Sequence, residues 1–475
     1  MDNLWFAVFS LLILLPLIHG IAKPERFYRY PYFMAAAFAV FLLPQSVSLR
    51  RFPGGVPLES IPQVLLMAVL CLGACLASAR LPKSRALARL LDRPVALERL
   101  LPPAAVFVGA AFFFSFLIWQ MPPEERGGSM WTGRVTIYHF FTQLVYPGFA
   151  IALFAALRGR SPAAWLLVGV AALIPLHSIL FAARREPAAL FALTVLLALY
   201  FQRSFRPPRF AAAAALAFAL VAIPATGSIR TVLQEEGFES VRKIDFVGNF
   251  RRFLNETSIL ELRNAAAVIY ATKLRSDYQF GTAYWDELVW RYIPAQFVGA
   301  ETKDGLMFRP RLVEKTGGPE TVNLGMREYA MPVGSTVTGL ADSFRQFGYF
   351  GSLFFLLLGL LFRTLWESSQ RPGAYLPQLL YILSTTSAMR ALTHQTVDFL
   401  PGFLYFAIFL GMAAIYARSP TTRKRAAAGT GSSSTLRTNA APLSGASPQQ
   451  PRRSASPPPT LAPAEKRPLD EILGD

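Results

Sequence analysis

Long apolar runs, separated mostly by short arginine-rich segments, recur along most of this chain. A helix needs roughly 20 predominantly apolar residues to cross a hydrocarbon layer about 30 Å thick. Of the 475 residues, 53% are hydrophobic and only 16% are charged, whereas a soluble domain has about 25% charged residues. The composition therefore excludes an ordinary soluble protein and favours an all-α integral membrane protein.

The apolar runs predict 11 transmembrane helices. The first run follows an uncharged start with an acidic Asp2, so we interpret it as a retained span and not as a cleaved signal. The seventh run is shorter than the others and is expected to begin earlier, to tilt or to stop below the outer surface. The predicted spans are 4–21, 31–49, 61–79, 103–121, 137–157, 163–182, 187–201, 210–226, 347–362, 375–395 and 402–417.

The arginines and lysines of the short loops favour one orientation. Most of them lie in one alternate set of loops, near residues 23–29, 80–99, 158–160, 203–209 and 363–371. Short loops rich in positive charge face the cytoplasm. We therefore expect the N-terminus outside and the C-terminus inside, and we attribute the net charge of +18 to orientation in the membrane and not to nucleic-acid binding.

This reading divides the chain into four regions. Residues 1–226 hold transmembrane helices 1–8, and 338–417 hold helices 9–11. Between them, 227–337 forms one large outer loop, whose apolar residues follow helical spacing from Phe246 to Leu274. The tail, 418–475, is rich in Ser, Pro, Ala and Thr and is predicted to be disordered and cytoplasmic.

Several ionisable residues lie within or beside apolar runs at the expected outer face. Charges at membrane depth are costly and are therefore functional candidates. The guanidinium group matches phosphate oxygens bidentately, so we interpret a group of arginines as ligands for the diphosphate of a lipid-linked substrate. The candidates are Arg184, Arg185, Arg390, Arg345, Arg230, Arg251 and Arg252.

A carboxylate or an imidazole near these arginines would accept a proton from an attacking hydroxyl group. The candidate bases are Asp342, His394 and Glu328, with Glu235 and Glu236 as weaker alternatives.

Metal-ligand motifs such as HExxH and DxD are absent from the sequence, so we expect neither a metal nor another cofactor. Cys71 and Cys75 are interpreted as small packing residues. A tight aromatic group in the outer loop is interpreted either as an interfacial anchor or as a surface that stacks on sugar rings. It contains Tyr284, Trp285, Trp290 and Tyr292.

Three features resemble the Wzy-type polysaccharide polymerases of the O-antigen polymerase and ligase superfamily. The run Ser178–Leu190, SILFAARREPAAL, is similar to the family's short turn with an arginine before a leucine-rich span. The run Gly334–Gly351, GSTVTGLADSFRQFGYFG, is similar to its acidic segment followed by Phe-Gly-Tyr-x-Gly. The third feature is the layout, with one large outer loop before a few final spans. Arg184 or Arg185 then corresponds to the turn arginine, and Asp342 corresponds to the acid.

The resemblance implies a GT-C-like helical fold and an inverting, metal-independent membrane glycosyltransferase. Such an enzyme polymerises undecaprenyl-diphosphate-linked oligosaccharide repeat units into surface polysaccharide or exopolysaccharide at the outer face of the bacterial inner membrane. The implied partners are that lipid-linked glycan, the lipid bilayer, a chain-length-determining co-polymerase and a flippase; no nucleic acid is expected.

Two alternative functions stay open besides a purely structural scaffold. One is an O-antigen ligase that transfers the glycan to a lipid A-core acceptor. The other is a lipid-glycan transporter or flippase, although transporters usually show internal repeats and binding sites at the bilayer midplane, and the sequence shows neither.

Overall fold

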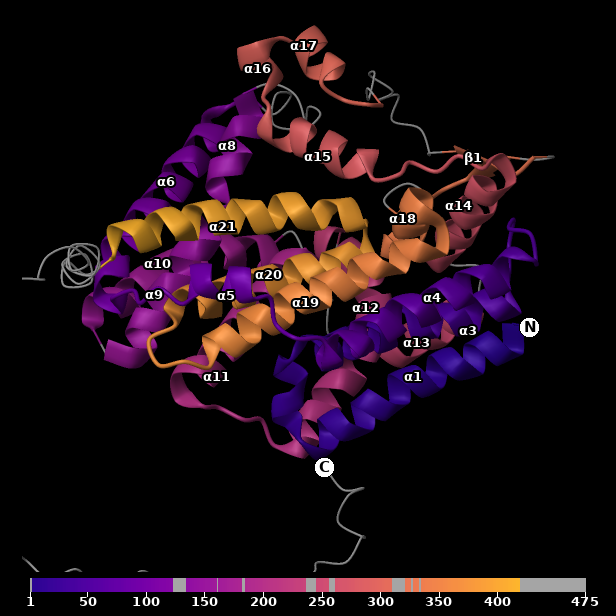
Figure 1. The fold of residues 1–475 in the computed structure, drawn as a ribbon, viewed down its shortest axis with the longest axis horizontal. Helices are drawn as coiled ribbons and strands as arrows, with labels where there is room; N and C mark the ends of the chain where they lie inside the picture. Colours follow the sequence, from indigo (N-terminus) through magenta and orange to yellow (C-terminus); the bar gives the residue numbers. More distant parts are fainter. Residues whose placement is uncertain are drawn as a thin grey trace, which may run out of the picture. The chain divides into compact units, whose positions relative to one another are not determined.

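The computed structural model describes residues 2–122, 134–159, 161–181, 184–235, 245–255, 261–309, 321–325, 328–332 and 335–418. Within these ranges, the side chains of Arg185, Arg252 and residues 223–235 are not described. The tail beyond Arg418, which was predicted to be disordered, lies outside the described residues. The described residues are predominantly helical (Figure 1). The expected all-α fold class is therefore confirmed.

The first half of the described chain consists of helices joined by short connections. In order, they are α1 (Asp2–Ala22), η1 (Pro24–Tyr28), α2 (Tyr30–Ala37), η2 (Phe38–Leu42), α3 (Leu43–Arg51), α4 (Ser60–Ala77), η3 (Ser78–Arg80), α5 (Arg85–Leu91), η4 (Leu97–Leu100), α6 (Leu101–Gln120), α8 (Arg134–Thr142), α9 (Val145–Gly159), α10 (Pro162–Leu180), α11 (Arg185–Arg203) and α12 (Arg209–Glu235). The wide π-turn of η2 lies directly before Pro44, whose ring and missing N–H do not fit a regular helical turn.

The second half contains the elements of the large loop and the last helices. They are α13 (Phe246–Asn255), α14 (Glu261–Arg275), α15 (Thr282–Tyr292), α16 (Ala295–Val298), α17 (Ala300–Gly305), β1 (Thr321–Asn323), β2 (Glu328–Ala330), α18 (Thr338–Phe347), η6 (Gly348–Ser352), α19 (Leu353–Ser369), α20 (Tyr375–Thr393), η7 (Thr396–Asp398) and α21 (Phe399–Tyr416). The two strands pair antiparallel, with Val322 opposite Tyr329.

Eight helical segments in the described chain are long and apolar enough to cross a membrane. They are Asp2–Ala22, Tyr30–Arg51, Ser60–Arg80, Leu97–Gln120, Arg134–Gly159, Pro162–Leu180, Thr338–Ser369 and Thr396–Tyr416. The other three predicted spans are also helical, within α11, α12 and α20. The run that looked short in the sequence belongs to α11, which begins at Arg185 and has 19 residues.

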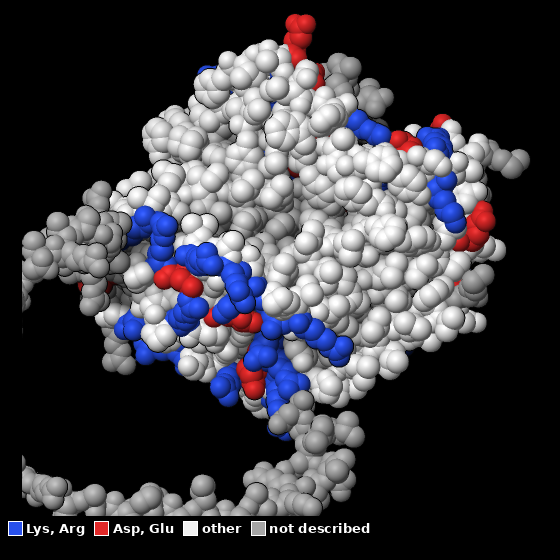
Figure 2. Space-filling view, viewed as in Figure 1, with Lys and Arg blue, Asp and Glu red and all other residues white. Residues whose placement is uncertain are grey.

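The outward surfaces of these helices expose apolar side chains. On α10, for example, Leu166 is 71% exposed, and on α6 Phe113 is 57% exposed. Exposed apolar area of this extent is unfavourable in water but suits contact with lipid. Figure 2 shows a broad face without charged residues between a basic edge near α5 and a smaller charged group near β1 and α14. These features identify a multi-pass membrane protein.

The basic loops predicted to share one side of the membrane contact one another. Arg363 donates to the carbonyl of Ala79, and Arg371 forms an ion pair with Asp92. The Arg29 guanidinium lies 5.9 Å from the centroid of the Trp366 ring. We call this region, with loops 23–29, 80–99, 203–209 and 363–371, the basic end.

Helices α11 and α20 pack together and are joined by polar contacts at both ends. Near one end, Gln202 Nε2 donates to Gln378 Oε1 over 3.0 Å. Near the other end, Arg390 Nη1 lies 2.9 Å from Glu186 Oε1. The first contact lies at the basic end. Along α20, Gln378 and Arg390 are 12 residues apart, which at about 1.5 Å per residue is about 18 Å, so the two contacts lie toward opposite ends of the helix pair.

The large loop is folded onto this bundle. Two helices, α13 and α14, form where the apolar spacing predicted helical structure, and Leu262, Ala266 and Ile269 of α14 are fully buried. Gln45 of α3 anchors the start of α14, because its side chain contacts both Glu261 Oε2 and the backbone N–H of Leu262. Helix α12 continues to Glu235, so the predicted loop boundary at residue 227 falls inside a helix.

The glycines of the Gly334–Gly351 run allow α18 to pack closely. A Cβ atom at Gly339 would lie 1.8 Å from the carbonyl oxygen of Ala391 in α20, and one at Gly351 would lie 1.9 Å from the carbonyl oxygen of Ser343. Gly348 ends α18 with φ +59°, a conformation that side chains disfavour. Residues 339–351 therefore form a tight corner between α18 and α19 that packs against α20.

We predict that Gly339→Ala lowers the free energy of unfolding by about 3 kcal/mol, at the upper end of the usual cost of overpacking, because the obstructing atom belongs to the backbone. Thermal unfolding of the purified protein in detergent measures this effect. Gly73→Ala in α4 is the matched control, since nothing lies within 4 Å of its added Cβ. Equal melting temperatures for both variants would contradict the packing described for α18.

Candidate functional site

Asp342 lies at the point where α18 meets the turn after α20. Its side chain is only 1% exposed. The carboxylate accepts a hydrogen bond from Thr396 Oγ1 at 2.5 Å and one from the backbone N–H of Val397 at 3.2 Å. Arg345 Nη2 lies 3.5 Å from its other oxygen. A buried charge requires such partners, so Asp342 fixes the position of η7.

Tyr284 of α15 extends this hydrogen-bond chain. Its hydroxyl lies 2.9 Å from Thr396 Oγ1, and its ring stacks on Phe354 at a centroid distance of 5.7 Å. Because the single Thr396 hydroxyl proton goes to Asp342, the Tyr284 phenol must donate to Thr396. Burial, and secondly the Asp342 charge, raise the pKa of Tyr284, so the phenol keeps its proton at neutral pH.

Asp398, at the end of the same turn, holds two arginines. Its Oδ2 lies 3.5 Å from Arg390 Nε, and its Oδ1 pairs with Arg291 Nη2 of α15. Each arginine has a second carboxylate, because Arg390 pairs with Glu186 at 2.9 Å and Arg291 pairs with Glu287 at 2.5 Å. We call these five residues the arginine–carboxylate network. It connects α11, α15, α20 and η7.

Arg184 lies directly beside this network. It precedes α11 as the N-cap residue, its side chain is exposed, and its backbone N–H donates to the Ser178 carbonyl over 3.3 Å. It also interacts electrostatically with His139 and Tyr146. Arg185 begins the helix, but its side chain lies outside the described residues.

The structure therefore groups several predicted residues around the end of α20. Arg390 belongs to the network, and Arg345 pairs with Asp342. His394 is exposed at the end of α20, with its Nδ1 atom 2.9 Å from Thr393 Oγ1 and its backbone N–H bonded to the Arg390 carbonyl. Four predicted residues thus lie within the packed corner of α18, α20 and η7.

Other predicted residues lie on elements that pack elsewhere. Glu328 is exposed on β2, opposite Asn323. Arg251 is exposed on α13, which packs against α3 and α12. Three further side chains are not described: Arg252 on the same helix, and Arg230 and Glu235 on α12. Glu236 lies entirely outside the described residues.

Sequence reasoning missed Glu287 and Arg291 as members of the site. A detectable signal was present, because residues four apart on a helix lie on one side of it, and this pair interrupts an aromatic segment. Thr396 and the hydrogen-bonding role of Tyr284 carried no comparable signal. Both depend on contacts between elements that are distant in the sequence.

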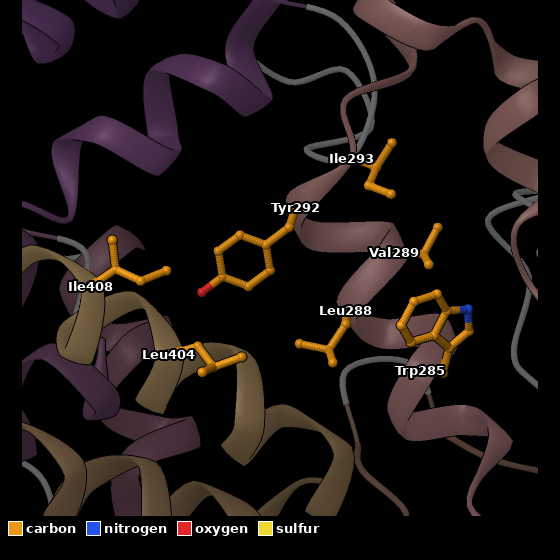
Figure 3. Close-up of a pocket in the computed structure, with 7 residues that line it drawn as sticks. All are labelled: Trp285, Leu288, Val289, Tyr292, Ile293, Leu404 and Ile408. Atoms are coloured by element: carbon orange, nitrogen blue, oxygen red, sulfur yellow. The ribbon is translucent and has the colours of Figure 1, made fainter.

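An apolar hollow of about 270 Å³ lies between α15 and α21 (Figure 3). Trp285, Leu288 and Tyr292 line it from α15, and Leu404 and Ile408 line it from α21. The Tyr292 hydroxyl donates to the Pro401 carbonyl over 2.6 Å, which ties the two helices together. Helix α15 thus contributes both to this hollow and, through Glu287 and Arg291, to the network.

The remaining predicted residues have ordinary packing roles. Trp290 lies beneath the Lys303 ammonium group, which is 4.3 Å from its ring centroid. Cys71 and Cys75 are both buried, and both are free cysteines that form no disulfide. Among the described residues, no group of three or more His, Cys, Asp or Glu side chains is arranged to hold a metal ion.

We predict that Tyr284→Phe lowers the free energy of unfolding by about 1–2 kcal/mol, because the buried Thr396 oxygen loses its donor. Tyr278→Phe provides the control, since the Tyr278 ring packs on Phe344 and its hydroxyl forms no hydrogen bond to any other described residue. Chemical unfolding in mixed micelles compares the two variants. Equal losses for both would show that the Tyr284–Thr396–Asp342 chain contributes no stability.

Comparison with known proteins covered family models, characterised proteins and solved structures. None of them matches this chain. The geometry of the network and the resemblance of the two sequence runs are therefore the observations that bear on the function.

Proposed function

We propose that the protein is a membrane glycosyltransferase that polymerises undecaprenyl-diphosphate-linked oligosaccharide repeat units at the outer face of the bacterial inner membrane. The observation that carries this proposal is the collection of Arg184, Arg390 and Arg291 at the end of α11 and α20 that lies opposite the basic end. We assign this cluster to the outer headgroup depth, where the diphosphate of a lipid-linked substrate would lie.

The proposal includes a topology of 11 spans in a GT-C-like arrangement, which counts α11, α12 and α20 together with the eight apolar segments. Short basic loops face the cytoplasm, so the basic end is assigned to that side. The N-terminus and the arginine–carboxylate network then lie outside, and the tail lies inside. The large loop covers the network from the outer compartment.

The chemistry of arginine supports binding of a diphosphate leaving group. The guanidinium group keeps its charge and donates two parallel hydrogen bonds to phosphate oxygens. Glu186, whose side chain is 48% exposed, is the partner of Arg390 most easily displaced by an entering diphosphate. Arg184 beside it is exposed and adds a second positive charge. Fixed charges of this kind stabilise the negative charge that develops as the diphosphate leaves.

In the proposed reaction, a hydroxyl oxygen of the acceptor repeat unit bonds to the anomeric carbon of the growing glycan. The bond from that carbon to the diphosphate oxygen breaks, and the diphosphate leaves with the electron pair. We assign His394 to accept the hydroxyl proton, because its ring is exposed beside the network. Asp342 is enclosed and already accepts several hydrogen bonds, so we assign it to hold η7 and Arg345 in place.

We expect Arg390→Gln to reduce polymer formation by roughly 100-fold or more, the usual loss when a preorganised charge-stabilising donor is removed. Electrophoresis of polysaccharide from a complemented deletion strain measures this effect, with membrane abundance of each variant checked in parallel. Arg51→Gln is the control, because Arg51 lies at the same end of the bundle but contacts Asn255 instead of the network. Unchanged polymer length in Arg390→Gln would refute the assignment.

The same strains distinguish the alternative functions. Accumulation of a lipid-linked single repeat unit in the deletion strain supports the polymerase. Accumulation of full-length polymer on its lipid carrier would indicate a ligase acting on a lipid A-core acceptor. Lipid-glycan translocation by the purified protein without chain elongation would indicate a flippase.

A further inference from the structure

A polar pocket of about 340 Å³ lies at the basic end, away from the arginine–carboxylate network. Three parts of the chain form it: the end of α9, the end of α11 with the linker that follows, and the turn between α19 and α20. Its lining includes Arg158, Gln202, Arg206, Arg371, Tyr375 and Gln378. The proposed reaction uses none of these residues.

The pocket has an excess of positive charge. Arg371 is paired with Asp92, whereas Arg158 and Arg206 form no ion pair within the part of the chain that the structure describes. The Arg158 guanidinium lies 5.7 Å from the centroid of the Tyr375 ring. Tyr375 begins α20, so the positive end of that helix dipole faces the same space. These features favour a bound anion.

The pocket also offers an acceptor that lacks a partner. Gln202 Nε2 donates to Gln378 Oε1, and Gln378 Nε2 donates to the Ser369 carbonyl over 2.8 Å. Gln202 Oε1 is buried and has no hydrogen-bond partner among the described residues. A buried acceptor without a donor is unfavourable. Because Gln202 lines the pocket, a rotation of its side chain would bring this enclosed oxygen to a ligand hydroxyl group, which would supply the missing donor.

Neighbouring aromatic rings place the pocket at the depth of lipid headgroups. Tyr200 stacks on Trp366 with a centroid distance of 5.5 Å, and both residues lie on helix segments that end at the basic loops. Tryptophan and tyrosine are enriched where a membrane protein passes from hydrocarbon to water. Basic pockets between helix ends at this depth suit phosphate-bearing headgroups.

We propose that this pocket binds the headgroup of an anionic phospholipid that carries a hydroxyl group, of the phosphatidylglycerol type. Arg158 and Arg206 bind the phosphate oxygens, and a headgroup hydroxyl donates to Gln202 Oε1. The bound lipid links the ends of α9, α11 and α20. Because the ends of α11 and α20 opposite the pocket carry Glu186 and Arg390, this site supports the same helix pair that holds the network.

Native mass spectrometry of the full-length protein tests the proposal by counting retained lipids. The probes are short-chain phosphatidylglycerol, phosphatidylcholine and inorganic phosphate. The wild-type protein is expected to retain phosphatidylglycerol in preference to phosphatidylcholine. The Arg158→Gln/Arg206→Gln variant is expected to bind it about tenfold more weakly, since charge-assisted contacts are lost. Arg85→Gln/Arg89→Gln is the matched control, because both arginines lie at the basic end outside the pocket.

A second variant, Gln202→Leu, keeps the arginines and is expected to reduce the preference for phosphatidylglycerol over phosphatidylcholine. Equal lipid retention by the pocket variant and its control would overturn the proposal. The proposal would also be overturned if millimolar inorganic phosphate competed with phosphatidylglycerol for the pocket and bound there as well as the lipid does. The ligand would then be a soluble anion. Since the pocket lies apart from the network, these outcomes do not depend on glycosyltransferase activity.

Discussion

The pairing of Asp398 with two arginines is the interaction on which the proposed site depends. Arg390 comes from α20 and Arg291 comes from α15 of the large loop, so one carboxylate joins the helical bundle to the folded loop. The two preceding residues of the same turn bind Asp342. Charged groups in a poorly hydrated region need partners of this kind, and the contacts place α11, α15, α18 and α20 around one turn.

Helix α20 relates this site to the rest of the molecule. It starts beside the basic loops, ends at Arg390 and His394, and packs against α11, which also has polar contacts near both ends. Between these polar contacts neither helix carries a charged residue, although α20 has a run of Ser and Thr residues at 384–387. A membrane favours this distribution, because charged groups are tolerated mainly near its two surfaces. The network and the polar pocket at the basic end thus lie at opposite ends of one helix pair.

The sequence allowed the helices to be predicted well, because bilayer thickness fixes the length of an apolar run. All 11 predicted positions are helical in the structure, although length and composition alone identify eight as membrane spans. Helix α20 is not among these eight, and most of its residues are buried within the protein. A buried helix packs against protein, so it tolerates the Ser, Thr and Gln residues that lower its hydropathy.

The candidate site was predicted less completely. Arg390, Arg345 and Asp342 stand out because they interrupt apolar sequence, and the structure does bring them together. Glu328 and Arg251 had the right chemistry but lie on elements that pack elsewhere. Arg291 and Tyr284 belong to a loop that docks through contacts with η7, among them the hydrogen bond between Tyr284 and Thr396. Contacts of that kind arise from tertiary packing and leave no periodic pattern in the sequence.

The central claim is that arginines, and not a metal ion, stabilise the diphosphate leaving group at the network. Incubation of the purified protein with a synthetic lipid-linked repeat unit, with and without a chelator, tests it directly. The account predicts chain elongation that persists in the chelator and is lost in Arg390→Gln. Elongation that stops in the chelator, or that persists in Arg390→Gln, would contradict it.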